Sequence, residues 1–72
     1  MEHVIVRFPE SRIVFIDGAE GGITNRRLRV DEGTHTFKLA DPKDYTPNWR
    51  RPTVTGTNPN KPMEVIFEKI QV

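Results

Sequence analysis

The stretch Ile16–Thr24, I-D-G-A-E-G-G-I-T, places three glycines directly after an apolar run. Glycines in this position either cradle a phosphate with their bare backbone or form a turn that needs positive φ angles. A dinucleotide-binding loop requires G-x-G-x-x-G followed by a helix, whereas this spacing is G-x-x-G-G and the next residues, I-T-N-R-R-L-R-V, alternate like a strand. A Gly-Lys-Ser/Thr motif is absent too. We therefore predict a hairpin in which Asp17-Gly18 and Gly21-Gly22 adopt left-handed conformations.

Side chains of alternating character recur along the chain, and helical spacing does not. The clearest alternation is T-H-T-F-K-L-A, Thr34–Ala40, which puts His35, Phe37 and Leu39 on one face and Lys38 on the other. The pattern predicts strands over His3–Phe8, Arg12–Asp17, Ile23–Val30, Thr34–Ala40, Thr53–Thr55 and Met63–Val72. Short strands separated by turn residues are typical of an antiparallel sandwich or small barrel. We predict an all-β fold, a small antiparallel β-sandwich of about six or seven strands, with residues 1–72 as a single domain.

Individual strands carry more specific expectations. Arg12–Asp17 is apolar on both faces and is expected to be well covered. Ile23–Val30 is expected to be one strand that points Leu28 and Val30 inward. Thr53–Thr55 follows a proline, which cannot donate to a ladder, so an edge position is predicted.

Composition excludes several classes of protein. The chain has no cysteine, so disulfides and thiolate metal sites are excluded. Lysine and arginine total 11 against 10 aspartates and glutamates, and a net charge of +1 gives no global field to attract nucleic acid or an anionic membrane. No run of residues reaches the length of a membrane span, and the N-terminus lacks a signal peptide pattern. If Met1 is the native start, a cytoplasmic location is expected; for a domain excised from a longer protein, the envelope or an unknown compartment is expected.

Several motifs resemble those of the PEGA domain family. They are R-I-V-F-I-D-G, then Gly22 and Thr24, then L-R-V-D-E-G-T-H-T-F-K-L, and finally D-Y-T-P-N-W-R-R-P-T-V-T. The resemblance covers about Arg12–Ile70, with two departures: Asn25 stands where the family usually has proline, and Asp44 stands where it has glycine. It implies a small β-sandwich without chemistry of its own. Family members are often appended to larger envelope proteins of bacteria or archaea, with a suggested role in adhesion or assembly.

The sequence favours a protein that is not an enzyme. Ser11 is the one serine, and no spacing links it to His3, His35 or Asp17 as a triad. Two unrelated histidines are too few for a zinc set, so neither a metal nor a cofactor is expected. On an apolar face, His35 is expected to be partly buried and bonded to backbone or to a neighbouring carboxylate.

Basic and aromatic residues form the candidate binding surface. Guanidinium groups bind phosphate or carboxylate, and an indole stacks on bases, sugars or arginine. The surface consists of Arg26, Arg27, Arg29, Tyr45, Trp49, Arg50 and Arg51. The alternative for these residues is a solvated or packing role, in which Arg27 and Arg29 pair with acidic neighbours and Trp49 covers the open end of the sandwich.

The two terminal strands suggest how such a module works. Both are apolar on both faces, which favours either a central place in a sheet or an edge that pairs with another chain. We predict a non-enzymatic binding or assembly module that contacts a protein partner or its own copy through an edge strand and the Trp49 loop. Nucleic-acid binding through the arginines and Trp49 is the alternative, and a carbohydrate stacked on Trp49 is a weaker one.

Overall fold

The computed structural model describes residues 1–70 and confirms the all-β fold. The described residues form ten short strands and no helix. Their bounds are β1 Glu2–Arg7, β2 Ile13–Ile16, β3 Ala19–Ile23, β4 Arg27–Val30, β5 Gly33–Thr34, β6 Phe37–Leu39, β7 Tyr45–Thr46, β8 Thr53–Val54, β9 Met63–Ile66 and β10 Glu68–Lys69. Within this part of the chain, no helix is long and apolar enough to cross a membrane.

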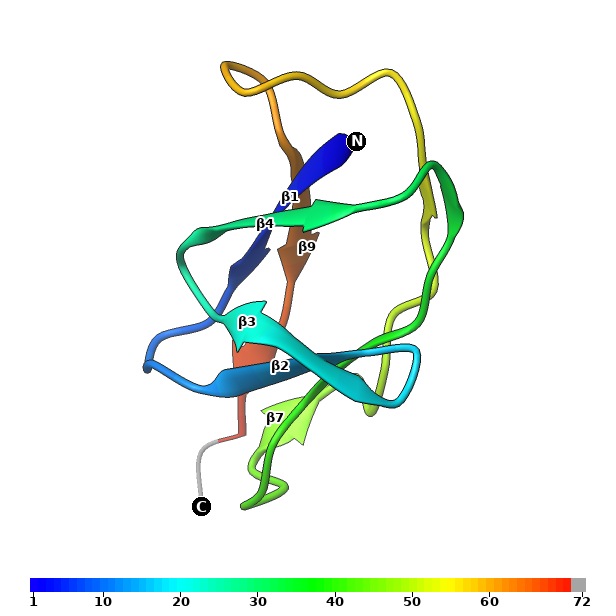
Figure 1. Ribbon diagram of the computed structural model, residues 1–72. Helices are drawn as coiled ribbons and strands as arrows, with labels where there is room; N and C mark the ends of the chain where they lie inside the picture. The colour runs from blue at the N-terminus through cyan, green and yellow to red at the C-terminus, as the bar shows by residue number, and fades with distance from the viewer. Residues whose placement is uncertain (71–72) are drawn as a thin grey trace.

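Two three-stranded sheets, in the orders β4-β1-β9 and β3-β2-β6, form the body of the domain (Figure 1). Two-stranded pairs, β10 with β7 and β5 with β8, flank them. Most pairs are antiparallel, as predicted, but β1 and β9 run parallel, with Val4 opposite Met63 and Val6 opposite Val65. The N-terminal strand is therefore central in its sheet, and β9 lies at the border of that sheet.

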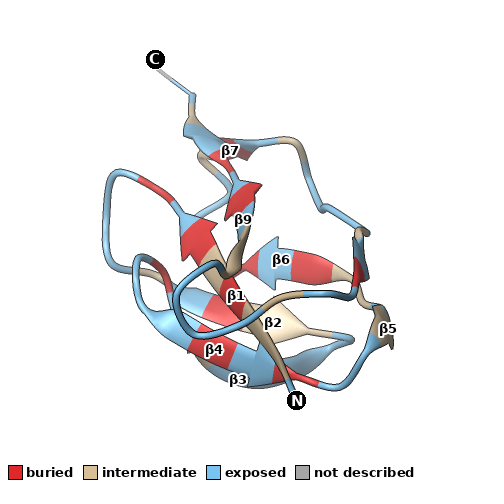
Figure 2. Cartoon of the chain, turned by 90° about the horizontal axis from the view of Figure 1, so that it is seen from above, coloured by how far each residue is buried: buried red, intermediate tan, exposed pale blue. Residues whose placement is uncertain are grey.

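The core lies between the two sheets, and Figure 2 shows buried residues separated by less buried ones along strands such as β1 and β4. The buried apolar side chains are Val4, Val6, Phe8, Val14, Leu28, Val30, Phe37, Leu39, Tyr45, Val54, Val65 and Phe67. The alternation read from the sequence is confirmed in β1, β4, β6 and β9, because the period of two separates covered from exposed positions there.

Strand β2 is a correction to the sequence analysis. Val14 is fully buried, but Ile13 is 41% exposed, and Phe15 and Ile16 are only partly covered. The strand was expected to be covered on both faces because it is apolar on both. Instead, one face of the β3-β2-β6 sheet packs on the core and the other faces solvent. The run of apolar residues in β2 therefore does not indicate a strand that is covered on both faces.

The glycine stretch is a hairpin, as predicted, but Gly21 and Gly22 do not form a second left-handed pair beside Asp17-Gly18. Asp17 and Gly18, with φ of 52° and 87°, form the two-residue turn between β2 and β3. Gly21 does not have a positive φ; it lies at a bulge in β3, where the register to β2 shifts. Gly22 has φ of 150° and packs so tightly that a Cβ would lie 2.1 Å from Leu28 Cδ2.

Three predicted strands are interrupted in the structure. Ile23–Val30 is the end of β3, a turn with Asn25 at φ of 65°, and then β4. Thr34–Ala40 divides into β5 and β6, which pair with different partners. Met63–Val72 divides into β9 and β10, and its last two residues, Gln71 and Val72, lie outside the described residues. In the second and third cases the side-chain pattern continues through the break, so alternation alone does not reveal it.

Candidate functional site

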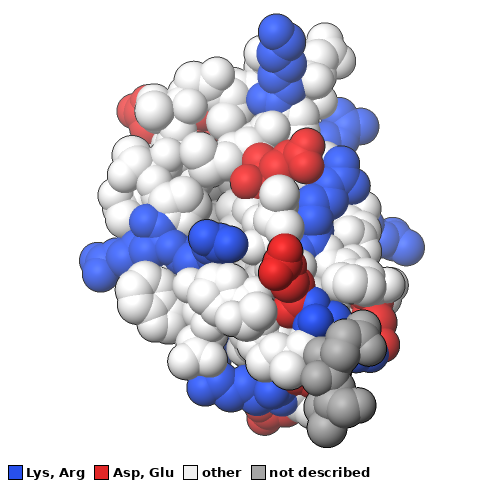
Figure 3. Space-filling model, turned by 180° about the vertical axis from the view of Figure 1, so that it is seen from behind, with Lys and Arg blue, Asp and Glu red and all other residues white. Residues whose placement is uncertain are grey.

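The structure separates the predicted binding surface into two groups. Arg27 and Arg29 project to solvent from β4, and Arg26 lies in the turn before it. Trp49, Arg50 and Arg51 lie in the segment before β8, on the far side of β1 and β9 from β4. On the face shown in Figure 3, basic side chains lie in separate groups with acidic side chains between some of them. The five arginines therefore do not form one continuous basic surface.

Tyr45 does not belong to any binding surface, which corrects the sequence analysis. Its side chain is 2% exposed, and its hydroxyl donates a hydrogen bond to the Leu39 carbonyl at 2.8 Å. Its ring packs edge-on against Phe8 and Phe67. An aromatic residue in an irregular connection gave no periodic pattern by which to predict its burial.

The segment Trp49–Pro52 is held in place through β6. Arg50 exchanges two backbone hydrogen bonds with Phe37, at 2.7 and 3.0 Å, which adds the segment to the outer side of the β3-β2-β6 sheet. Phe37 is itself fully buried, so the segment is attached to a residue of the core. The segment therefore stands between β6 on one side and β9 on the other.

A groove of about 460 Å³, which we call the β9 groove, runs between this segment and β9. It is lined by Arg50, Arg51, Pro52, Glu64, Val65 and Ile66. Phe67 N–H donates to the Arg7 carbonyl of β1, so the backbone groups of Ile66, one residue earlier, point the opposite way, toward the groove. The Arg50 side chain meets them there, with Nε 3.0 Å from the Ile66 carbonyl oxygen. The Arg50 side chain thus donates to a carbonyl of β9 that would accept a backbone N–H if another strand paired there.

A second groove, of about 410 Å³, lies on the other side of the same segment. We call it the Trp49 groove; it is lined by Thr36, Lys38, Lys43, Asn48, Trp49 and Arg51. Trp49 is 56% exposed, so it does not cover the core. Arg51 lines both grooves, which makes them neighbours.

Two basic residues of the Trp49 groove, Lys38 and Lys43, were missed in the sequence analysis, as were its polar residues Thr36 and Asn48. Lys38 is on the outward face of the Thr34–Ala40 alternation, and that position was the signal that could have found it. Lys43 lies in an irregular connection with no periodic pattern. Only the tertiary structure brings Lys43 next to Trp49.

His35 is bonded within the fold, as expected. Its Nδ1 lies 2.6 Å from Asp17 Oδ2, and its Nε2 lies 2.6 Å from the Asp31 carbonyl oxygen. The Asp17 carboxylate, followed by the Asp31 carbonyl, raises the pKa of His35, because both acceptors favour the ring with two N–H groups. The Asp17 pKa is lowered, first by the Thr36 backbone N–H and then by His35. Neither nitrogen of this ring is free to serve as a base.

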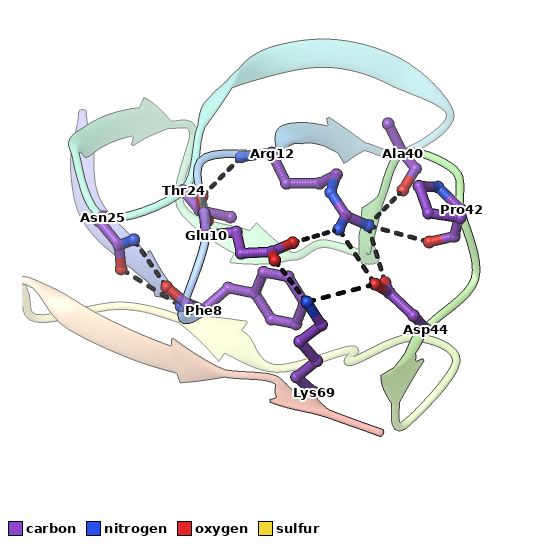
Figure 4. Close-up of polar contacts among 9 residues, drawn as sticks. All are labelled: Phe8, Glu10, Arg12, Thr24, Asn25, Ala40, Pro42, Asp44 and Lys69. Carbon is purple, nitrogen blue, oxygen red and sulfur yellow. Dashed lines mark hydrogen bonds and ion pairs between the residues drawn. The ribbon is translucent and has the colours of Figure 1, made fainter. Parts of the chain in front are cut away.

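A polar cluster around Arg12 joins the turn after β1 to the connection after β6 (Figure 4). The guanidinium, in a side chain only 10% exposed, donates to the Ala40 and Pro42 carbonyls and to the carboxylates of Asp44 and Glu10. The two carboxylates, Asp44 first and then Glu10, raise the pKa of Arg12. Its charged carbon also lies 5.1 Å from the centre of the Phe8 ring. The cluster uses every group for the fold, so it is structural.

Two further hydrogen bonds and two ion pairs complete this cluster. The buried Thr24 hydroxyl accepts from Arg12 N–H and donates to the Glu10 carbonyl. Lys69 pairs with Glu10 and reaches toward Asp44. The contacts of Lys69 and Arg12 lower the pKa of Glu10, and Arg12 lowers that of Asp44. The turn after β1, the connection after β6 and strand β10 are thereby tied together.

Among residues 1–70, no three histidine, aspartate or glutamate side chains gather in a way that could hold a metal ion. Comparison of the chain with protein-family models, with curated proteins and with solved structures gave no match.

Proposed function

We propose that this domain is a non-enzymatic module that binds an extended segment of a partner protein by strand addition at the β9 groove. The observation that carries the proposal is the border of β9, which faces a groove instead of another strand. Strand addition uses main-chain hydrogen bonds for affinity and alternate side chains for specificity.

Both walls of the groove suit an extended peptide. On one wall, the backbone groups of Ile66 point into the groove and only one, the carbonyl, is met by Arg50. On the other wall, Arg50 uses its backbone toward β6, so the backbone groups of Arg51 face the groove by the alternation of a strand. The Ile66 side chain is 50% exposed beside it and offers an apolar contact. A segment of a few residues would find partners on both sides.

The motif resemblance agrees with this function. Assembly or adhesion is the role suggested for PEGA domains, and we propose membership of that family from the motifs alone. His35, in the G-T-H motif, is a scaffold residue of the family by that resemblance, and its bonds to Asp17 and Asp31 suit such a part.

Nucleic-acid binding is the weaker alternative. It uses the arginines together, whereas Arg27 and Arg50 are separated by strands β1 and β9. Glu64 lines the β9 groove and pairs with Arg7, which places a carboxylate where a phosphate chain would pass. The arginines supply positive charge for this alternative, but they do not form a continuous path for the phosphate backbone of a nucleic acid.

The experiment is a selection of short displayed peptides on the isotope-labelled domain, followed by mapping of the amide signals that each selected peptide shifts. We expect shifts at Glu64, Ile66 and Arg51, and loss of binding in Ile66→Lys, because a charge on an edge strand opposes pairing. Ile13→Lys is the matched control, since Ile13 is also apolar, 41% exposed and on a strand.

Three outcomes overturn the proposal. In the first, no peptide is selected; in the second, equal loss of binding occurs in Ile13→Lys. In the third, a single-stranded oligonucleotide binds with an affinity that falls steeply with salt and shifts the β4 arginines instead. Concentration-dependent sedimentation that Ile66→Lys abolishes would identify the partner segment as that of a second copy and support the strand-addition site.

A further inference from the structure

The Trp49 groove combines positive charge with an exposed aromatic ring. Lys38, Lys43 and Arg51 line it, and among residues 1–70 none of these three cations has an ion pair. Arg12 and Lys69, in contrast, form ion pairs within the domain, Arg12 with Asp44 and Lys69 with Glu10. Cations left without a carboxylate, around a concave surface, are complementary to an anionic ligand.

We propose that the Trp49 groove receives the acidic side chains of the partner segment that enters the β9 groove, so that the ligand of this domain is an extended acidic peptide. This inference rests on the proposed function, because the same segment occupies both grooves. It assigns the Trp49 groove to specificity and the β9 groove to backbone pairing.

The two grooves are positioned for one ligand because Arg51 lines both. A peptide that pairs with β9 advances about 3.3 Å per residue, so a few further residues carry it over Arg51 to the neighbouring hollow. Arg51 then meets a carboxylate at the border, where its planar guanidinium can bind both oxygens.

Trp49 supplies the apolar part of the Trp49 groove. Its ring is 56% exposed, and a large rigid aromatic is a common anchor of protein interfaces because it buries much area at little entropic cost. Thr36 and Asn48 add hydrogen-bonding groups at the wall. The partner segment therefore carries an apolar side chain among its acidic ones.

Asp17, an acid near Arg51, does not neutralise the Trp49 groove. Asp17 is close enough to Arg51 for the arginine to contribute to lowering its pKa. Its two oxygens, however, are engaged by His35 and by the Thr36 N–H. Arg51 remains able to bind a second carboxylate.

The observations favour a peptide over a nucleic acid. A phosphate backbone would gain from the cations of the Trp49 groove but would be repelled by Glu64 in the β9 groove. A peptide places neutral backbone beside Glu64 and acidic side chains beside Lys38 and Lys43. The border of β9 offers hydrogen-bonding groups that match a peptide backbone.

The test uses Trp49 as its reporter, because it is the one tryptophan of the chain. Its fluorescence is followed while three peptides are added: valine alternating with glutamate, valine alternating with glutamine, and valine alternating with lysine. We expect a change with the glutamate peptide alone, with an affinity that declines as salt is raised. In the double variant Lys38→Gln, Lys43→Gln, the affinity should fall roughly threefold to tenfold, as for two partly exposed charge pairs.

The matched control is the double variant Arg26→Gln, Arg29→Gln, which removes the same charge from exposed positions next to or on β4. It should bind the glutamate peptide as the native domain does. An equal loss in both double variants overturns the inference, because the effect would then reflect net charge. A glutamine peptide that binds as tightly as the glutamate peptide overturns it as well.

Failure of this inference is distinguishable from failure of the proposed function. Uncharged peptides that shift the amides of Glu64 and Ile66, with no benefit from glutamate, sink the acidic specificity and leave strand addition standing. A glutamate peptide that changes Trp49 fluorescence without shifting those amides supports the Trp49 groove and removes the β9 groove. A single-stranded oligonucleotide that outcompetes the glutamate peptide replaces the peptide ligand and overturns the inference.

Discussion

The two ends of the segment that links β6 to β8 lie in very different surroundings. At its start, Ala40 and Asp44 are held by Arg12, a side chain 10% exposed with several acceptors around it. At its end, Arg50 is exposed and its side chain makes one hydrogen bond, to the Ile66 carbonyl. We call the first the clamped end and the second the open end. Two arginines therefore have different roles: Arg12 ties separate parts of the chain together, whereas Arg50 lines a groove.

The difference shows that charge on a small β domain has no single meaning. A guanidinium that is shielded from solvent and donates to several acceptors stabilises the fold. An exposed guanidinium with a single acceptor contributes little to the free energy of unfolding. The clamped end therefore carries stability, and the open end is free to bind. Substitutions at the two ends should separate these two roles.

The largest expected effect is at the clamped end, for Arg12→Ala. Loss of a charged donor that serves several acceptors should cost roughly 2–3 kcal/mol of the free energy of unfolding. For a chain of this size the melting temperature should fall by roughly 10–20 °C. Arg12→Lys should recover only part of this, because an ammonium lacks the planar fork. Full recovery by lysine in thermal unfolding would contradict the role of the fork.

A smaller effect is expected at the seam between the two sheets, for Gly22→Ala. The new methyl group would meet the buried Leu28 side chain and would sit at φ of 150°, so a cost of roughly 1–3 kcal/mol is expected. Gly56→Ala is the comparison, because Gly56 also has a positive φ but open space around its Cβ position. Urea unfolding should show the larger loss for Gly22→Ala, and equal losses would remove Leu28 from the explanation.

The open end should tolerate Arg50→Ala. An exposed side chain with one hydrogen bond should change the free energy of unfolding by less than about 0.5 kcal/mol. The same variant should alter the binding of peptides selected at the β9 groove, since Arg50 lines it. A stability loss as large as that of Arg12→Ala would show that the two ends do not differ.

The finest difference concerns pH. The His35 pKa is raised in the fold, so the stability from its bonds to Asp17 and Asp31 is fully present below the unfolded value of about 6.5 and is lost as pH rises through the folded pKa. The Asp17 pKa is lowered, so its share is present above its unfolded value and is lost as pH falls through the folded pKa. Thermal unfolding across neutral pH should show a decline toward alkaline pH that His35→Gln removes. Arg12 does not titrate in this range, so the clamped end should not contribute to that decline.

Much of the fold could be predicted from local patterns. Phe37 and Leu39 are buried and Lys38 is exposed because a strand on a one-sided sheet must alternate. The Asp17-Gly18 turn follows from two residues that tolerate positive φ. The break between β5 and β6 could not be predicted, because the alternation of side chains continues through it.

The candidate site was less accessible to sequence reasoning. Trp49 and Arg51 were identified by residue type, and the structure places them in one groove. Lys43 comes from an irregular connection, and Tyr45, from the same connection, turns inward. Where a chain has no period, only its long-range contacts decide which side chains face solvent. The parallel pairing of β1 with β9 is likewise a long-range choice that no local pattern encodes.

That parallel pairing also has a kinetic consequence. Val4 lies opposite Met63, so the central strand of one sheet acquires its second neighbour only when a loop of nearly the whole described chain closes. Loop closure over such a span is entropically costly and slows folding relative to proteins with local contacts. Until the loop closes, the side of β1 that will pair with β9 has no partner. The nascent or refolding domain therefore has an exposed strand edge at β1, which is prone to aggregation and is absent from the folded domain.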